Sequence, residues 1–116
     1  MSVTKPITID HDAPNSQTFT YEINGVPPNL SSGWTSTMHF WRAGVSSTLA
    51  PEYTATQASG ITLGALGAIT VNYVTVQTGL DAVSALDANW HYVLAIRQTG
   101  FQNKQILSGP FTRLQP

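Results

Sequence analysis

The stretch Trp34-Thr-Ser-Thr-Met-His-Phe-Trp-Arg42 decides the fold, because its side chains alternate with a period of two residues. One parity carries Trp34, Met38 and Phe40, and the other carries threonines together with His39 and Trp41. Such alternation of β-branched and aromatic residues predicts a strand with one face in a core. We therefore expect Trp34, Met38 and Phe40 to be buried, and Trp41 to lie outside the core.

A second stretch, residues 88–99, repeats the pattern. Its apolar parity carries four large side chains, Trp90, Tyr92, Leu94 and Ile96. Shorter alternating or apolar stretches predict the remaining strands, at 5–10, 16–24, 49–56, 61–63, 68–74 and 102–114. Strands at these intervals indicate an all-β fold, an immunoglobulin-like antiparallel β-sandwich of about seven to eight strands. The two long strands are expected to form its centre.

One segment departs from strand periodicity and predicts a short crossover helix near residues 76–86. Its apolar residues fall at i, i+4, i+7 and i+10 and form one helical stripe of Val76, Leu80, Val83 and Leu86. Gly79, in the first turn, is unfavourable for a helix. The helix is therefore expected to connect two strands of the sandwich.

Residues 1–15 are expected to form an N-terminal arm, and residues 16–116 a single immunoglobulin-like domain. Ile7 and Ile9 alternate in the arm and predict an edge strand, with Pro6 at its start, where a missing N–H is tolerated. An edge strand offers its main chain to a partner. Ile7 and Ile9 are therefore candidate interface residues.

Charged side chains are scarce, at 9% of the chain, with five basic and six acidic residues and a net charge of −1. A quarter is usual, and no basic stripe is present, so we expect no nucleic-acid partner. Cysteine is absent, which excludes disulfides and thiolate metal sites. No apolar run has the length of a signal peptide or a membrane span. We therefore expect assembly in a host cytoplasm and no membrane partner.

Titratable side chains are too few and too scattered to predict catalysis. Of the six carboxylates, Asp10 and Asp12 lie close together, on either side of His11, but two carboxylates on an arm do not complete a coordination shell. His39 and His91 share the outer parity of the two long strands, yet zinc prefers three or four protein ligands. We therefore expect no enzymatic activity, no cofactor and no metal.

His39, Trp41 and His91 are instead candidate interface residues on one sheet face. Tryptophan is enriched among interface anchors, and an outward tryptophan is unusual on a free surface. Burial of this face under the protein's own loops is an equally weighted alternative. The sequence does not separate the two.

The order of these elements resembles the immunoglobulin-like tail and baseplate domains of tailed bacteriophages and prophages. The resemblance is closest to the small domain at the start of upper-baseplate and fibre-attachment proteins, and it covers residues 16–114. The segments that carry it, besides the helical stripe, are Gln17-Thr-Phe-Thr-Tyr21, Ile23-Asn-Gly-Val-Pro-Pro-Asn-Leu30, Gly33-Trp-Thr-Ser-Thr-Met-His-Phe40, Ser59-Gly-Ile-Thr-Leu63, Gly67-Ala-Ile-Thr-Val71, Trp90-His-Tyr-Val-Leu-Ala-Ile96 and Ile106-Leu-Ser-Gly-Pro-Phe-Thr112.

This resemblance implies a structural protein of a phage virion, without catalysis, that docks other tail, baseplate or fibre proteins in several copies. A homo-oligomer within the virion is expected. A capsid decoration protein is the nearest alternative, because it requires the same small sandwich. A carbohydrate- or host-surface-binding module is less favoured and would need an exposed aromatic platform, such as Trp41 with Tyr53. An enzyme would need a pocket that collects His39, His91 and an acid.

Overall fold

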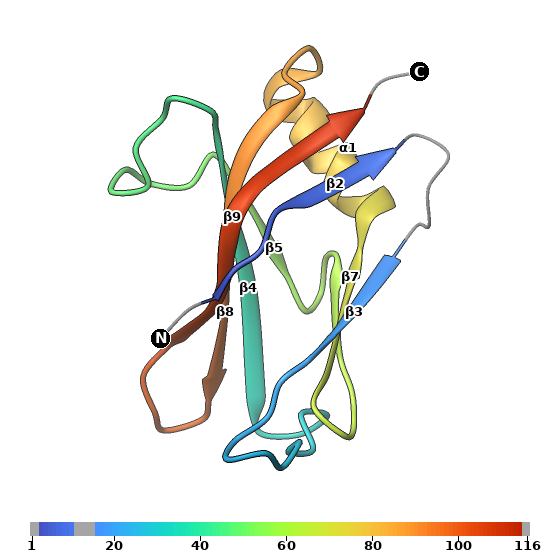
Figure 1. Cartoon of the computed structure of the whole chain (residues 1–116), viewed down its shortest axis with the longest axis vertical. Helices are drawn as coiled ribbons and strands as arrows, with labels where there is room; N and C mark the ends of the chain where they lie inside the picture. Colours follow the sequence, from blue (N-terminus) through green and yellow to red (C-terminus); the bar gives the residue numbers. More distant parts are fainter. Residues whose placement is uncertain (1–2, 11–15, 115–116) are drawn as a thin grey trace.

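The structure, a computed structural model, describes residues 3–10 and 16–114, which form nine strands and one helix (Figure 1). The strands are β1 (Val3–Thr4), β2 (Ile7–Asp10), β3 (Ser16–Thr20), β4 (Trp34–Arg42), β5 (Tyr53–Thr56), β6 (Ile61–Leu63), β7 (Ala68–Asn72), β8 (Asn89–Gln98) and β9 (Lys104–Leu114). Helix α1 (Tyr73–Ser84) connects β7 to β8. Every stretch predicted to be a strand contains one, although β3 and β5 are shorter than expected.

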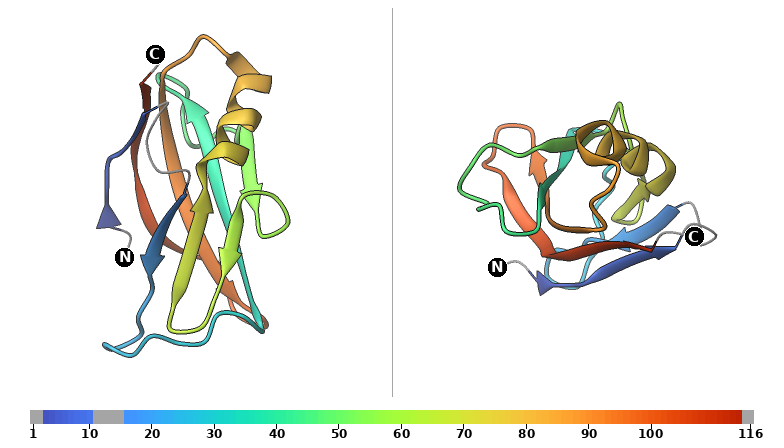
Figure 2. Two further views of the ribbon diagram at one scale, coloured as in Figure 1. Left: turned by 90° about the vertical axis from the view of Figure 1, so that its right-hand side faces the viewer. Right: turned by 90° about the horizontal axis from the view of Figure 1, so that it is seen from above.

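The strands form two sheets that pack as a sandwich (Figure 2). The larger sheet has the order β1-β9-β8-β4-β5, with β2 also paired to β9, and the smaller has the order β3-β7-β6. This is the order of strands G, F, C, C′ and of strands B, E, D in an immunoglobulin-like sandwich. The predicted all-β sandwich with one short crossover helix is confirmed. β1 and β2 depart from antiparallel pairing, because both run parallel to β9.

The parity predicted for the two long strands is correct for the core. Met38 and Phe40 of β4 are fully buried, and all four large residues of the β8 inner face are at most 2% exposed. Leu30, from the β3–β4 connection, is also fully buried. Trp34 differs from the prediction, because it is only half-buried and packs edge-on against Tyr21 at a centroid distance of 6.0 Å. It lies at the first residue of β4, where less of the sandwich covers it.

Helix α1 begins at Tyr73, earlier than the predicted residue 76, because Asn72 caps it. The Asn72 side chain accepts hydrogen bonds from the backbone N–H groups of Val74 and Thr75, which satisfies donors that a helix start leaves free. Tyr73 is therefore helical, although its side chain is buried as the strand pattern indicated.

Only half of the predicted helical stripe is buried. Val76 and Leu80 are fully buried, whereas Val83 is 38% exposed and Leu86, beyond the end of α1, is 96% exposed. α1 contacts β3 and β7 in one sheet and β5 in the other, so it lies across one end of the sandwich (Figure 2). The sheets cover the first two turns of α1, and its last turn extends beyond them. Val83 and Leu86 are therefore exposed.

The predicted edge strand in the N-terminal arm is present as β2, but it belongs to the sandwich. Ile7 and Ile9 are each 4% exposed and are part of the hydrophobic core. Parallel pairing with β9 directs both side chains toward the smaller sheet. Their side chains are therefore not available to a partner, whereas the main-chain edge of β2, which pairs with β9 among the described strands, keeps the predicted interface role open. His11 and Asp12 lie outside the described residues.

Candidate functional site

The three predicted interface residues of the large sheet do lie together, on its outer face. Trp41 of β4 is the cross-strand partner of His91 of β8, and their rings stack at 5.3 Å with an interplanar angle of 14°. The His39 ring lies 6.0 Å from the Trp41 ring on the same face. This outer-face row (His39, Trp41 and His91) follows from the shared parity of the residues and from the pairing of β4 with β8.

Two residues of the outer-face row, Trp41 and His91, are held by the protein's own loop, residues 43–52, so they do not form a free surface. The Trp41 indole N–H donates to the Leu49 carbonyl at 3.0 Å, and His91 Nε2–H donates to the Val45 carbonyl at 2.7 Å. Trp41 is 4% exposed although it lies outside the core between the sheets. The expectation of an exposed Trp41 is wrong, and burial under the protein's own loop, the alternative, is correct.

Each of the two histidines makes a hydrogen bond within the protein, His91 to the covering loop and His39 to a neighbouring strand. His39 Nδ1 lies 3.0 Å from the Thr54 hydroxyl on the neighbouring strand β5. Partial burial lowers the pKa of His39 from its usual value, because desolvation disfavours the charged imidazolium. Among the described residues, no group of three or more His, Cys, Asp or Glu side chains could hold a metal ion.

The aromatic platform of Trp41 with Tyr53, given as an example for glycan binding, is not formed. Tyr53 packs against Phe40, at a centroid distance of 5.7 Å, and against Gly79 of α1. These contacts place Tyr53 on the inner side of the large sheet, whereas Trp41 lies on the outer side. The two rings therefore do not present a common surface.

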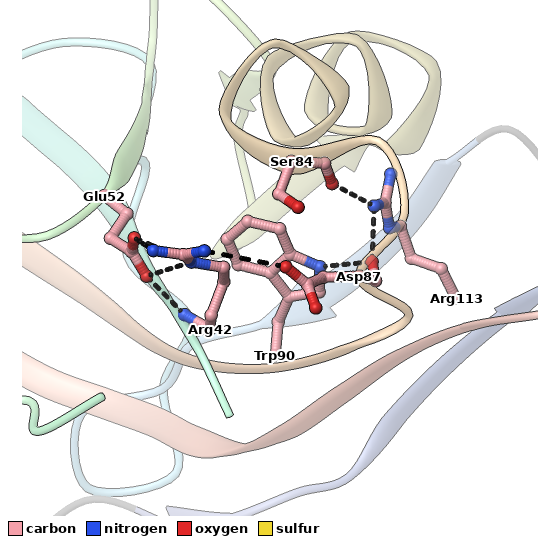
Figure 3. Close-up of polar contacts among 6 residues, drawn as sticks. All are labelled: Arg42, Glu52, Ser84, Asp87, Trp90 and Arg113. Carbon is pink, nitrogen blue, oxygen red and sulfur yellow. Dashed lines mark hydrogen bonds and ion pairs between the residues drawn. The ribbon is translucent and has the colours of Figure 1, made fainter. Parts of the chain in front are cut away.

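A buried arginine, Arg113 of β9, joins the end of α1 to the large sheet (Figure 3). Its side chain is 1% exposed and pairs with Asp81 at 2.5 Å. The same guanidinium donates to the carbonyls of Ser84 and Asp87, at 3.1 and 2.5 Å. It lies 5.7 Å from the Trp90 ring. Carbonyls at a helix C-terminus lack helical partners and carry partial negative charge, so Arg113 is a structural cap and not a substrate-binding group.

Arg42 makes a second, exposed ion pair beside this cap (Figure 3). Its guanidinium pairs with Glu52 at 2.8 Å and lies 3.8 Å from Asp87. The hydrogen bond from Arg42 holds the pKa of Glu52 below its usual value. Because Glu52 ends the loop that covers Trp41, this pair contributes to holding that loop on the sheet.

A groove of about 470 Å³ separates β3 from β1 and β9. Its walls include Val3, Lys5, Phe19, Tyr21, Lys104 and Ile106. The Lys5 ammonium lies 5.4 Å from the Phe19 ring centroid, and the Lys104 ammonium 5.7 Å from the Tyr21 ring centroid. A cation held over an aromatic face is favourable, so both lysines are directed across the groove from one sheet toward the other.

Sequence reasoning missed this groove because its lining comes from distant parts of the chain. Phe19 and Tyr21 both belong to the predicted strand at residues 16–24. Their proximity to Lys5 and Lys104 depends on the parallel pairing of β1 with β9, which no local pattern encodes. The two lysines were visible only as two of five basic residues.

A second, smaller cleft of about 360 Å³ lies on the outer face of the large sheet. It is lined by Trp41 and His91 together with polar residues such as Ser47, Gln105 and Ser108. Its aromatic side chains are already engaged by the covering loop.

No helix in the described ranges is long and apolar enough to span a membrane. No protein-family model matches this chain, and a search of curated proteins yields no significant match.

Proposed function

We propose that this protein is a non-catalytic assembly module of a tailed-phage virion, which docks tail or baseplate proteins and is present in several copies. Support for the virion context comes from the resemblance of residues 16–114 to phage tail domains. Support for a docking role comes from the surface of the sandwich.

One end of the sandwich exposes large apolar side chains, and this observation carries the proposal. Ile23 and Val26, in the β3–β4 connection, are 43% and 65% exposed, and Leu66, in the β6–β7 turn, is 74% exposed. Phe101, between β8 and β9, is 64% exposed. Figure 1 shows these three connections at the same, lower end of the molecule.

The apolar end is built as a defined surface. Ile23 and Val26 bond to each other through their backbones at 2.9 and 3.0 Å. The Gly67 N–H donates to the Pro28 carbonyl at 2.7 Å and ties the β6–β7 turn to the β3–β4 connection. Exposed apolar side chains gathered at one end of a domain favour an interaction site there, and low surface charge reduces the desolvation cost of close packing.

Light scattering of the purified protein across a concentration series tests assembly in several copies. We expect the mass to rise with concentration toward a trimer or hexamer, with or without EDTA. The double variant Val26→Asp, Leu66→Asp should remain monomeric, because it places charges on the apolar end. Leu86→Asp is the matched control, since Leu86 is 96% exposed beyond α1, away from this end. A wild-type monomer at every concentration would contradict self-assembly.

The virion context requires a separate experiment, because a capsid decoration protein would use the same surfaces. Antibody labelling of purified phage particles should place the protein on the tail. Label on the head would instead support the decoration role, and particles free of label would refute both.

A further inference from the structure

The groove between β3 and β1/β9 has main-chain groups along one wall that no described strand satisfies. β3 is an edge strand of the smaller sheet and pairs with β7. The Tyr21 N–H donates to the Gly67 carbonyl at 2.8 Å, in continuation of this pairing. Backbone hydrogen bonds alternate in direction along an antiparallel strand. Thr18 and Thr20 therefore turn their N–H and C=O groups away from β7, and both line the groove.

On the opposite wall, the backbone of Lys5, whose side chain carries a positive charge, is held by two hydrogen bonds. The Lys5 backbone N–H donates to the Ser108 carbonyl at 2.7 Å, and the Lys5 carbonyl accepts a 2.6 Å hydrogen bond from the Tyr92 hydroxyl. Ile106 and Leu107 of β9 pack against the core from the same wall. A preformed wall lowers the entropic cost of binding a ligand.

The groove also holds two of the basic side chains, Lys5 and Lys104, each placed over an aromatic ring. Arg42 and Arg113 form ion pairs, and Arg97 donates to the Phe101 carbonyl at 2.7 Å. Within residues 3–9 and 16–114, no ion pair joins Lys5 or Lys104 to a carboxylate. A single acidic residue, Glu22, lies in the lining. The site therefore carries an excess of positive charge.

We propose that this groove binds an extended acidic segment of a partner protein, which adds as a strand to the free edge of β3. The main-chain groups of Thr18 and Thr20 pair with the segment, and carboxylates of the segment pair with the ammonium groups of Lys5 and Lys104. A peptide fits better than a simple anion, because only a peptide also satisfies an open strand edge. A strand of about five residues, roughly 17 Å long, matches β3. This inference rests on the proposed docking function and names one of its sites.

Selection from a displayed library of random eight-residue peptides, with the purified chain as target, tests the proposal. We expect enrichment of peptides with two or more Asp or Glu residues among β-branched ones. Synthetic copies of the enriched peptides should bind more weakly as salt rises. They should shift the amide NMR signals of Thr18 and Thr20.

Variants then locate the site. Lys5→Gln and Lys104→Gln should each weaken binding about two- to fivefold, as expected for exposed ion pairs. Lys104→Glu should weaken it further. Thr20→Pro should remove most of it, because proline deletes an outward N–H and is tolerated in an edge strand. Arg97→Gln is the matched control and should leave binding unchanged.

Several outcomes would overturn the proposal. These are no enrichment of acidic peptides, peptide binding that Lys104→Glu leaves unchanged, or peptide binding that a folded Thr20→Pro variant leaves unchanged. Thermal melts identify any variant that fails to fold. If Thr20→Pro fails to fold, the lysine variants still test the site. If peptides fail to bind while the wild type still self-associates, the groove assignment is wrong and the assembly function stands.

Discussion

Replacement of Arg113 by methionine should remove a large part of the stability of this sandwich. The side chain is 1% exposed and makes three hydrogen bonds, to Asp81 and to the carbonyls of Ser84 and Asp87. A hydrogen bond to a charged group contributes about 1.5–3 kcal/mol. The cost of burying a guanidinium offsets part of that sum, and methionine retains much of the apolar packing.

We therefore expect Arg113→Met to lower the free energy of unfolding by about 3 kcal/mol. In a domain of this size that corresponds to a fall in Tm of about 12 °C. Asp81→Asn should cost at most about 1 kcal/mol, because the Asp81 side chain is 55% exposed and asparagine still offers an acceptor. Urea denaturation and thermal melts followed by circular dichroism measure both values. Arg97→Met, at an exposed arginine, is the control and should stay within about 0.5 kcal/mol of wild type.

The comparison separates a helix cap from a simple ion pair. If Asp81→Asn costs as much as Arg113→Met, the charge pair dominates and the carbonyl contacts are secondary. If Arg113→Met is neutral or stabilising, the desolvation free energy of the buried guanidinium is at least as large as the stabilisation from its hydrogen bonds and ion pair. Either result would refute Arg113 as a stabilising cap of α1.

Three further changes test other parts of the structure. Trp41→Ala should lower the free energy of unfolding by about 3 kcal/mol, as for a buried aromatic, and unchanged stability in urea would show that the covering loop does not bury it. Gly79→Ala should destabilise by about 1–3 kcal/mol, because a Cβ there would lie 2.2 Å from Cε1 of Tyr53; helix propensity alone predicts a gain, so a stabilised variant would refute this close packing. Burial raises the pKa of Tyr92 to about 12, above its unfolded value of about 10. Its contribution to stability is therefore complete below pH 10 and is lost as the pH rises toward 12. Tyr92→Phe should show a smaller alkaline loss than wild type in urea titrations between pH 9 and 12, because burial also raises the pKa of Tyr73, which still titrates.

Patterns within single strands predicted the sandwich because side-chain direction alternates locally. The parity of residues 34–42 and 88–99 placed Met38, Phe40 and Tyr92 in the core, and the structure confirms each position. Parity also brought Trp41 and His91 to one outer face. Parity does not reveal what covers that face, and loop 43–52 has no periodicity of its own from which its path could be predicted.

Local signals likewise missed the start of the helix. Asn72 caps α1 by accepting two backbone N–H bonds, and this capping ends β7 before Tyr73. Tyr73 satisfies both patterns, since its side chain is buried whether the backbone is extended or helical. Because burial of Tyr73 fits both a strand and a helix, the apolar pattern did not predict the boundary between β7 and α1.

The sequence by itself determined which residues share a face, where most strands lie, and that a helix links two of them, because these properties depend on neighbours within a few positions. Tertiary structure alone decided that Ile7 and Ile9 enter the core, that Trp41 is covered, and that Lys5 and Lys104 border one groove. Each of these depends on pairing or loop contacts between distant segments, such as the parallel pairing of β1 and β2 with β9. Which distant segments pair is decided by the packing of the whole chain, and the periodicity of a single segment does not predict it.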